Sequence, residues 1–129
     1  MGVTGPQRGP AVTDVEVAGI GIHPFGRFDA SVTDLGGAAV RAALDEAGIH
    51  HRSGFQAAFC GTAYDGLAAG HKVLGALGLT GGPNVDVEAG CASGAAALML
   101  ATSAVRAGQY DTVLDFGIEK MPKGVIRSS

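Results

Sequence analysis

The sequence predicts a single α/β domain built on a mainly parallel sheet. Short apolar stretches bounded by glycine or proline alternate along the chain with longer segments in which apolar residues recur at helical spacing. Strands that alternate with helices are typical of parallel strands joined by right-handed crossovers. At 129 residues, 47% of them hydrophobic, the chain is long enough for one domain with a core and too short for two domains of ordinary size.

The domain is expected to cover residues 14–124. Residues 1–13 hold three glycines and two prolines among few apolar residues, which is typical of a flexible N-terminal segment, and residues 125–129 are expected to form a tail. Valine and isoleucine recur between positions 15 and 22 and predict the first strand, which ends at a turn around Pro24.

A helix is expected next, from Ser31 to Gly48. Ser31 and Asp34 resemble a capping box, apolar residues follow at helical spacing, and glycine is a common helix terminator. The remaining expected elements are a strand at 55–60, a helix at 67–77 with Leu67, Leu74 and Leu77 facing inward, a strand at 83–87, a helix from Cys91 to about Arg106, and a strand at 112–118. The predicted order is therefore βαβαβαβ with a four-stranded sheet.

The helix predicted over residues 92–108 has an unusual composition. Arg106 is its only charged residue, and nearly every face is apolar or small. A helix of this kind is normally buried on all sides, whereas a single sheet covers only one of them. We therefore expect this helix to contact a further layer outside the four predicted strands.

Cys91 stands between a short apolar strand and this alanine-rich helix, directly after a glycine. Backbone N–H groups in the first turn of a helix lack internal partners and carry the positive end of its dipole, so an anionic sulfur is stabilised there. Cys91 is therefore a candidate nucleophile. The alternative is a small buried hydrophobic residue, which is the commonest role of a free cysteine.

Two stretches of the chain resemble thiolases. VEAGCASGAAAL at residues 87–98 is similar to the nucleophile segment of that family, and GIEKMPKG at residues 117–124 is similar to the segment that follows it. The similarity is greatest to the thiolases related to sterol carrier protein X, and it extends over residues 14–124. The Cys-Ala-Ser-Gly part also resembles ketoacyl synthases, which share the fold.

The resemblance implies a partial thiolase-like fold, the first half of an N-terminal thiolase domain, in which the helix after Cys91 lies centrally between the sheets of two similar domains. It also implies that the Cys91 thiolate accepts an acyl group from a coenzyme A thioester, while its own backbone N–H binds the developing oxyanion. The reaction would be thiolytic cleavage of a 3-oxoacyl-CoA or the reverse condensation. Coenzyme A enters as a substrate, and no cofactor or metal is implied.

The family supplies a histidine base and a second cysteine from a later domain. Neither motif occurs here, and the context of Cys60 does not match the second cysteine. The resemblance therefore implies that activity needs a missing half or a partner, either a second copy of the chain in a homo-oligomer or a complementary subunit. Related folds also include retro-aldol lyases that act on side-chain acyl-CoA with a small partner, and a non-catalytic interaction module is a third possibility.

Other polar residues have simpler interpretations. The four histidines stand at turns or on a helix face without ligand spacing, and a solvated or capping role is expected for His23, His50, His51 and His71. Ser93 and Gly94 are expected to serve structure, the serine by bonding backbone donors in the first turn and the glycine by letting the helix approach a neighbouring segment closely. For Glu119, Lys120 and Lys123 a solvated turn and a contact with coenzyme A both remain open. Gly19, Gly21 and Gly26 do not match the dinucleotide fingerprint.

Composition excludes several classes of function. The net charge is −3 and the basic residues are scattered, which argues against a nucleic-acid partner. No apolar run is long enough to span a membrane. Cys60 and Cys91 are far apart in the sequence and are expected to be reduced thiols in a cytoplasmic protein.

Overall fold

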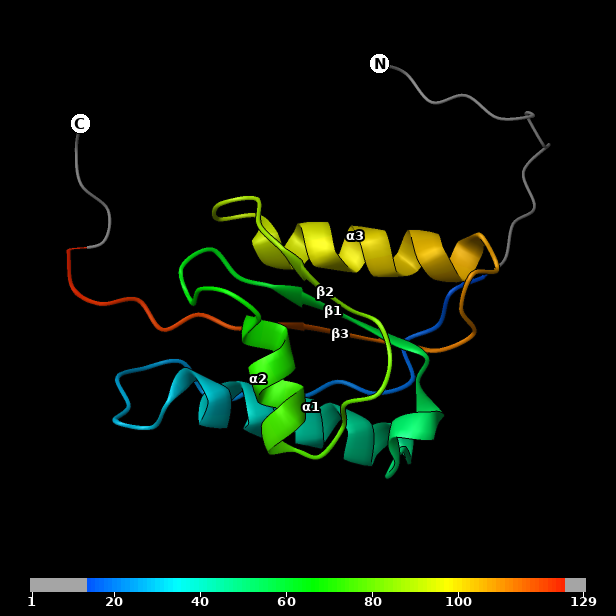
Figure 1. Ribbon diagram of the computed structural model, residues 1–129, viewed down its shortest axis with the longest axis horizontal. Coiled ribbons are helices and arrows are strands. Elements are labelled where there is room, and N and C mark those ends of the chain that lie inside the picture. The colour runs from blue at the N-terminus through cyan, green and yellow to red at the C-terminus, as the bar shows by residue number, and fades with distance from the viewer. Residues whose placement is uncertain (1–13, 125–129) are drawn as a thin grey trace, which may run out of the picture.

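Three parallel strands form the sheet, in the order β2-β1-β3, in a computed structural model that describes residues 14–124 (Figure 1). The strands are β1 (Ala57–Gly61), β2 (Asn84–Val87) and β3 (Val113–Gly117); the helices are α1 (Val32–Ala47), the short 3-10 helix η1 (Arg52–Gly54), α2 (Ala69–Ala76) and α3 (Ser93–Arg106). The predicted parallel α/β fold is confirmed. The flexible segment and the tail expected at 1–13 and 125–129 lie outside the described residues.

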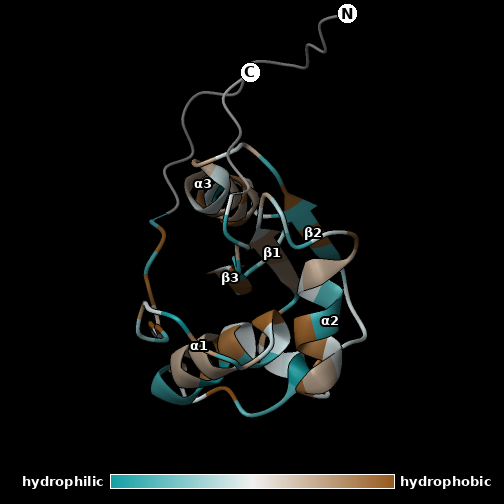
Figure 2. Cartoon of the chain, turned by 90° about the vertical axis from the view of Figure 1, so that its left-hand side faces the viewer, coloured by the Kyte–Doolittle hydropathy of each residue, from teal (hydrophilic) through white to brown (hydrophobic). Residues whose placement is uncertain are grey.

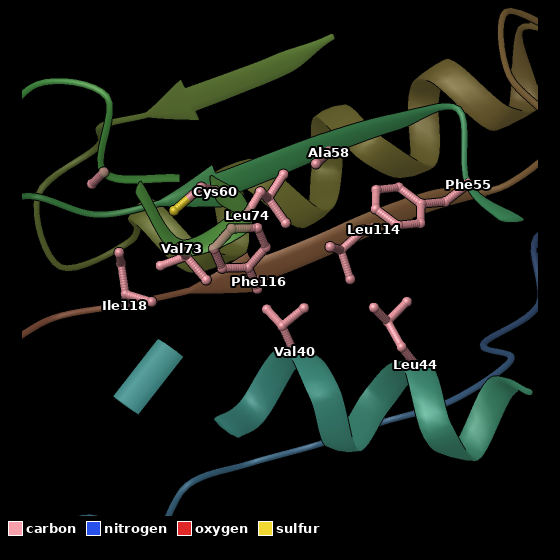
Figure 3. Close-up of a cluster of buried hydrophobic side chains, with 11 residues drawn as sticks. Val40, Leu44, Phe55, Ala58, Cys60, Val73, Leu74, Leu114, Phe116 and Ile118 are labelled. Carbon is pink, nitrogen blue, oxygen red and sulfur yellow. The ribbon is translucent and has the colours of Figure 1, made fainter. Parts of the chain in front are cut away.

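Helices cover both faces of the sheet. Helices α1 and α2 lie on one side and α3 on the other, so the chain is arranged in three layers (Figures 1 and 2). All five residues of the central strand β1 are buried, as expected for a strand covered on both faces. The larger part of the core lies between the sheet and α1 and α2, where Val40 and Leu44 of α1 face Leu114 and Phe116 of β3 (Figure 3).

On the opposite face, small residues bring α3 close to the sheet. Ala97, Ala101 and Ala104 are buried against Phe59 and Ala57 of β1. The outer side of α3 exposes large apolar side chains: Leu98 is 53% exposed, Met99 62% and Leu100 40%. Within the described residues α3 is thus covered on one side only, and its contact with a further layer stays a prediction.

The first predicted strand, residues 15–22, is not part of the sheet, which has three strands rather than four. This segment passes close to α1, and its apolar side chains are largely exposed, Val17 at 77% and Ile22 at 70%. Glycine explains the packing: a Cβ atom at Gly19 or Gly21 would collide with the backbone of α1. The valine and isoleucine pattern was typical of a strand, but strand pairing depends on a neighbour, and here the chain lies against a helix.

The residues predicted to cap and to end α1 do so in the structure. The Ser31 hydroxyl accepts a hydrogen bond from the Asp34 N–H at 3.1 Å, and Gly48 ends the helix with a φ of 71°. Helix α2 is shorter than predicted because Ala68, with a φ of 56°, interrupts the helical backbone before Ala69. Leu67 consequently lies outside the helix and is 91% exposed, so its inward orientation was wrongly predicted. Leu74 is buried and Leu77 packs partly buried against the core, as predicted.

Candidate active site around Cys91

Cys91 lies at the edge of the sheet where all three strands end. Because the strands are parallel, the segments that follow β1, β2 and β3 leave the sheet on the same side (Figure 1). The first turn of α3 packs against this edge. A Cβ atom at Gly61, the last residue of β1, would lie 2.8 Å from the Cα of Gly94, and one at Gly117, the last residue of β3, would lie 4.0 Å from the same atom.

The turn that carries Cys91 is closed by a serine. The Ser93 hydroxyl accepts a hydrogen bond from the Ala89 N–H at 2.8 Å and donates one to the Gly90 carbonyl at 2.7 Å. Gly90 has a φ of 58°, which favours glycine, and the Ser93 side chain is buried. The structural role predicted for Ser93 is confirmed. Cys91 was predicted to begin the helix, but α3 begins two residues later at Ser93, because residues 90–92 form the turn before it; Cys91 is exposed.

Gly94 does not have the role that the sequence suggested. A Cβ atom at Gly94 would meet no atom within 4 Å, so its lack of a side chain is not what allows α3 to approach its neighbours. The close approach depends on Gly61, where the added atom would contact the backbone of Ser93 and Gly94.

The two cysteines differ sharply in environment. Both are free thiols, as predicted, but Cys60 is fully buried within β1 while Cys91 is exposed. Burial, and to a lesser extent the nearby carboxylates with Asp86 first among them, together raise the pKa of the Cys60 thiol to about 12. Cys60 is therefore protonated at neutral pH and unsuited to nucleophilic attack.

His23, His50 and His71 have partners away from Cys91. His71 Nδ1 lies 3.1 Å from Asn84 Nδ2, His50 lies 3.8 Å from Asp45, and His23 packs edge-on against Phe28. In the part of the chain that the structure describes, no hydrogen bond joins Cys91 to a histidine. A base for the cysteine is not supplied by the geometry of residues 14–124.

The residues after β3 form a network that the sequence did not indicate. Glu119 accepts hydrogen bonds from the N–H groups of Ala63 at 2.9 Å and Tyr64 at 3.0 Å, and Asp65 accepts one from the Lys120 N–H at 3.0 Å. The turn at Glu119 and Lys120, for which a solvated turn and a coenzyme A contact were both open, is thus hydrogen-bonded to the chain itself. Residue spacing offers no signal for these contacts, because the partners are 55 or 56 positions apart.

The environment of the Asp65 carboxyl disfavours its charged form. Burial raises the pKa of the Asp65 carboxyl, the hydrogen bond from the Lys120 N–H opposes that shift, and the neighbouring Glu119 carboxylate adds to it. The two carboxylates lie at the same edge of the sheet as Cys91.

A large cavity lies elsewhere among the described residues. A space of about 930 Å³ is lined by residues of the segment 14–28 and of α1, β3 and α3, and Cys91 does not line it. Its wall includes Asp115, whose buried Oδ1 has no hydrogen-bond partner among the described residues. Burial raises the pKa of Asp115 to about 6. The site at Cys91 is an exposed surface, and it is the stronger candidate because no cysteine is among the residues that line the cavity.

Among residues 14–124, His, Cys, Asp and Glu side chains form no group of three that could hold a metal ion. No helix in this range is both long and apolar enough to cross a membrane.

The comparisons with known proteins, by family model and by sequence, agree with one another. Residues 15–128 match the family model described as thiolase, N-terminal domain. The chain is 35% identical over 106 residues to the benzoylsuccinyl-CoA thiolase subunit BbsB of Thauera aromatica, covering 81% of this chain and 28% of that protein. It is 35% identical over 118 residues to sterol carrier protein 2 of Gallus gallus, with 88% and 21% covered. An acetyl-CoA acetyltransferase of Methanothermobacter thermautotrophicus is 35% identical over 114 residues, with 84% and 30% covered.

Solved structures agree on the fold. The 3-oxoacyl-(acyl carrier protein) synthase III of Pseudomonas aeruginosa aligns with a TM-score of 0.55 at 27% identity, over 66% of this chain and 26% of that one. The corresponding synthase of Aquifex aeolicus aligns with a TM-score of 0.56 at 20% identity, over 64% and 28%, and at that identity shows the fold alone. The chain spans less than a third of the length of each of these proteins.

Proposed function

Because the chain belongs to the thiolase family, as the match of residues 15–128 to its N-terminal domain shows, we propose that it carries the acyl-accepting part of a thiolase-type acyltransferase. Cys91 is the nucleophile in this proposal. The observation that carries it is the exposed position of Cys91 in a turn held by Ser93, at the carboxyl edge of a parallel sheet. Ligands of open α/β sheets bind at that edge.

The proposed half-reaction transfers an acyl group to sulfur. The Cys91 thiolate attacks the 3-oxo carbonyl carbon of a 3-oxoacyl-CoA, and the backbone N–H of Cys91 binds the oxyanion that forms. Cleavage of the bond between the α and β carbons leaves an acyl group on Cys91 and an acyl-CoA enolate, which takes up a proton. The thiol of a second coenzyme A then attacks the acyl-enzyme, forms a new thioester and releases the cysteine. The condensation runs the same steps in reverse.

A complete cycle requires an acid and a base that residues 14–124 do not place beside Cys91. We propose that these groups come from a complementary thiolase half or subunit, or from a second copy of this chain. The exposed apolar side of α3, formed by Leu98, Met99 and Leu100, supports such a contact because apolar surface of this kind usually marks an interface. The relative BbsB is itself named as a subunit.

The same surface favours a second candidate, a non-catalytic interaction module. In that case the face of α3 would be the functional feature, and Cys91 would be dispensable. The acyltransferase requires a reactive thiol at Cys91, whereas the interaction module does not.

The test is alkylation of the purified chain with iodoacetamide across pH, with mass-spectrometric assignment to Cys60 or Cys91. A second sample is incubated with acetyl-CoA and examined for an acetyl group on Cys91. We expect alkylation and acetylation at Cys91 but not at Cys60, and the variant Cys91→Ala as control takes up neither group. A folded chain whose Cys91 accepts no acyl group overturns the acyltransferase proposal and leaves the interaction module.

A further inference from the structure

Two segments at the carboxyl edge of the sheet are joined by side chains rather than by strand pairing. The first is the loop 62–68 between β1 and α2, and the second is the exit segment 118–124 after β3. Pairing between the strands ends with the Gly61 and Gly117 register, after which the Ile118 N–H donates to the Gly61 carbonyl at 3.0 Å. Beyond this point the contacts between the two segments come from Glu119 and Asp65.

The contacts are reciprocal. Glu119 of the exit segment accepts two backbone N–H groups of the loop, Ala63 to Oε2 at 2.9 Å and Tyr64 to Oε1 at 3.0 Å. Asp65 of the loop accepts the backbone N–H of Lys120 at 3.0 Å. Hydrogen bonds from N–H groups to a carboxylate are charge-assisted and stronger than those between neutral groups. Each segment thus fixes the backbone of the other.

We call these reciprocal contacts of Glu119 and Asp65 the clamp, and further contacts extend it. The Thr62 hydroxyl lies 3.4 Å from both carboxylates. The Lys120 ammonium group donates to the Ala30 carbonyl at 2.6 Å, which ties the exit segment to the chain just before α1. Three segments distant in the sequence therefore meet around Glu119.

The clamp borders the turn that carries Cys91. The Thr62 N–H donates to the carbonyl of Val87, the last residue of β2, at 3.1 Å. Gly61, the residue before the loop, packs against the backbone of Ser93 and Gly94 in the first turn of α3. The loop therefore begins against both segments that flank Cys91.

The loop has few other anchors. The side chains of Tyr64 and Leu67 are 51% and 91% exposed, and Gly66 and Ala68 have φ values of 82° and 56°. Because these side chains are not buried, the backbone conformation of the loop depends on hydrogen bonds. At the start of the loop, Glu119 accepts two of them, from the N–H groups of Ala63 and Tyr64.

We propose that Glu119 is a positioning residue for the site at Cys91. Its carboxylate fixes the loop 62–68 as a wall beside the Cys91 turn, and the loop in turn sets the approach of a coenzyme A thioester to the sulfur. This inference rests on the proposed function. It assigns Glu119 no contact with the reacting atoms.

The test compares Glu119→Gln with Glu119→Asp and with the control Glu46→Gln. The glutamine keeps the size of the side chain but replaces one acceptor oxygen by an NH₂ group, which cannot accept from a backbone N–H. The aspartate keeps both oxygens. Glu46 is an exposed residue of α1, far from the clamp in the sequence.

Two reagents measure access to Cys91 without any general base. Iodoacetamide reports the small-molecule reactivity of the sulfur, and coenzyme A disulfide reports the approach of the coenzyme A moiety. In the exchange the Cys91 thiolate attacks one sulfur of the disulfide, forms a mixed disulfide with coenzyme A and releases the other coenzyme A as a thiolate. Hydrogen exchange at the Ala63 and Tyr64 amides shows whether the loop has been released.

We expect Glu119→Gln to speed exchange at both amides and to lower the coenzyme A disulfide rate about tenfold relative to the iodoacetamide rate. Glu119→Asp should recover part of this ratio, and Glu46→Gln should leave it at the wild-type value. The inference is overturned if hydrogen exchange at Ala63 and Tyr64 becomes faster in Glu119→Gln while the ratio of the coenzyme A disulfide rate to the iodoacetamide rate does not change. Absence of acetyl transfer to Cys91 in the wild type would instead contradict the proposed function, because the disulfide exchange does not depend on that transfer.

Discussion

The Ser93 hydroxyl bridges the turn that carries Cys91, accepting from the Ala89 N–H at 2.8 Å and donating to the Gly90 carbonyl at 2.7 Å. Both backbone groups flank the cysteine on its N-terminal side. The turn is therefore held from within the chain, before any substrate or partner binds.

Replacing Ser93 by alanine should loosen this turn. The buried hydroxyl serves one backbone donor and one acceptor, so its removal should lower the free energy of unfolding by about 1–3 kcal/mol. Chemical denaturation measures the change. Ser103→Ala, at an exposed position of the same helix, is the matched control and should change the free energy by less than about 0.5 kcal/mol. Equal stabilities of the two variants would show that the Ser93 hydrogen bonds do not hold the turn.

Two glycines near Cys91 should respond to alanine with opposite signs. At Gly61 the new methyl group would lie against the backbone of Ser93 and Gly94, which cannot move aside without shifting α3. Gly61→Ala should therefore lower the free energy of unfolding by about 1–3 kcal/mol. At Gly94 the methyl group meets no atom within 4 Å, so Gly94→Ala should raise it by about 0.5–1 kcal/mol through helix propensity. Thermal or denaturant unfolding of both variants provides the comparison, and a loss at Gly94 would contradict the packing described.

Asp115 should make stability fall as pH rises. Burial raises its pKa from 3.8 to about 6 in the folded chain, so the folded state binds the proton more tightly than the unfolded state does. The contribution of Asp115 to the free energy of unfolding is therefore largest below pH 3.8, falls as the pH rises to about 6, and stays constant above that pH. Asp115→Asn should remove this dependence and stabilise the protein at pH 7, while Glu46→Gln should leave it. Unfolding curves between pH 4 and pH 8 measure the effect; an unchanged slope in Asp115→Asn would rule it out.

Cys60 should report unfolding rather than chemistry. Its thiol is buried and its pKa is raised to about 12, so alkylation at pH 8 requires the sheet to open. The rate of labelling at Cys60 should rise with urea concentration in parallel with loss of secondary structure, whereas Cys91 should label at a rate that urea changes little. Labelling of Cys60 at the same rate as Cys91 in buffer alone would contradict the burial of β1.

Local signals accounted for much of the fold. The capping residues Ser31 and Asp34 and the terminator Gly48 place α1 as predicted, since caps are satisfied by hydrogen bonds within a few residues. The strands β2 and β3 also fall within the predicted ranges, and β1 extends one residue beyond its predicted end, to Gly61. Residues 15–22 show the limit of this reasoning, because a strand exists only if a neighbouring strand accepts its hydrogen bonds, and the chain there packs on α1 instead.

The sequence by itself determined the alternation of strands and helices, the family resemblance and the choice of Cys91, because these depend on short spacings along the chain. Only the tertiary structure decided that Cys91 is exposed while Cys60 is buried, and that Glu119 binds the amides of Ala63 and Tyr64. The reason is physical: burial and hydrogen bonding between residues more than fifty positions apart are set by how the layers pack, and no local pattern encodes which distant backbone groups a carboxylate will meet.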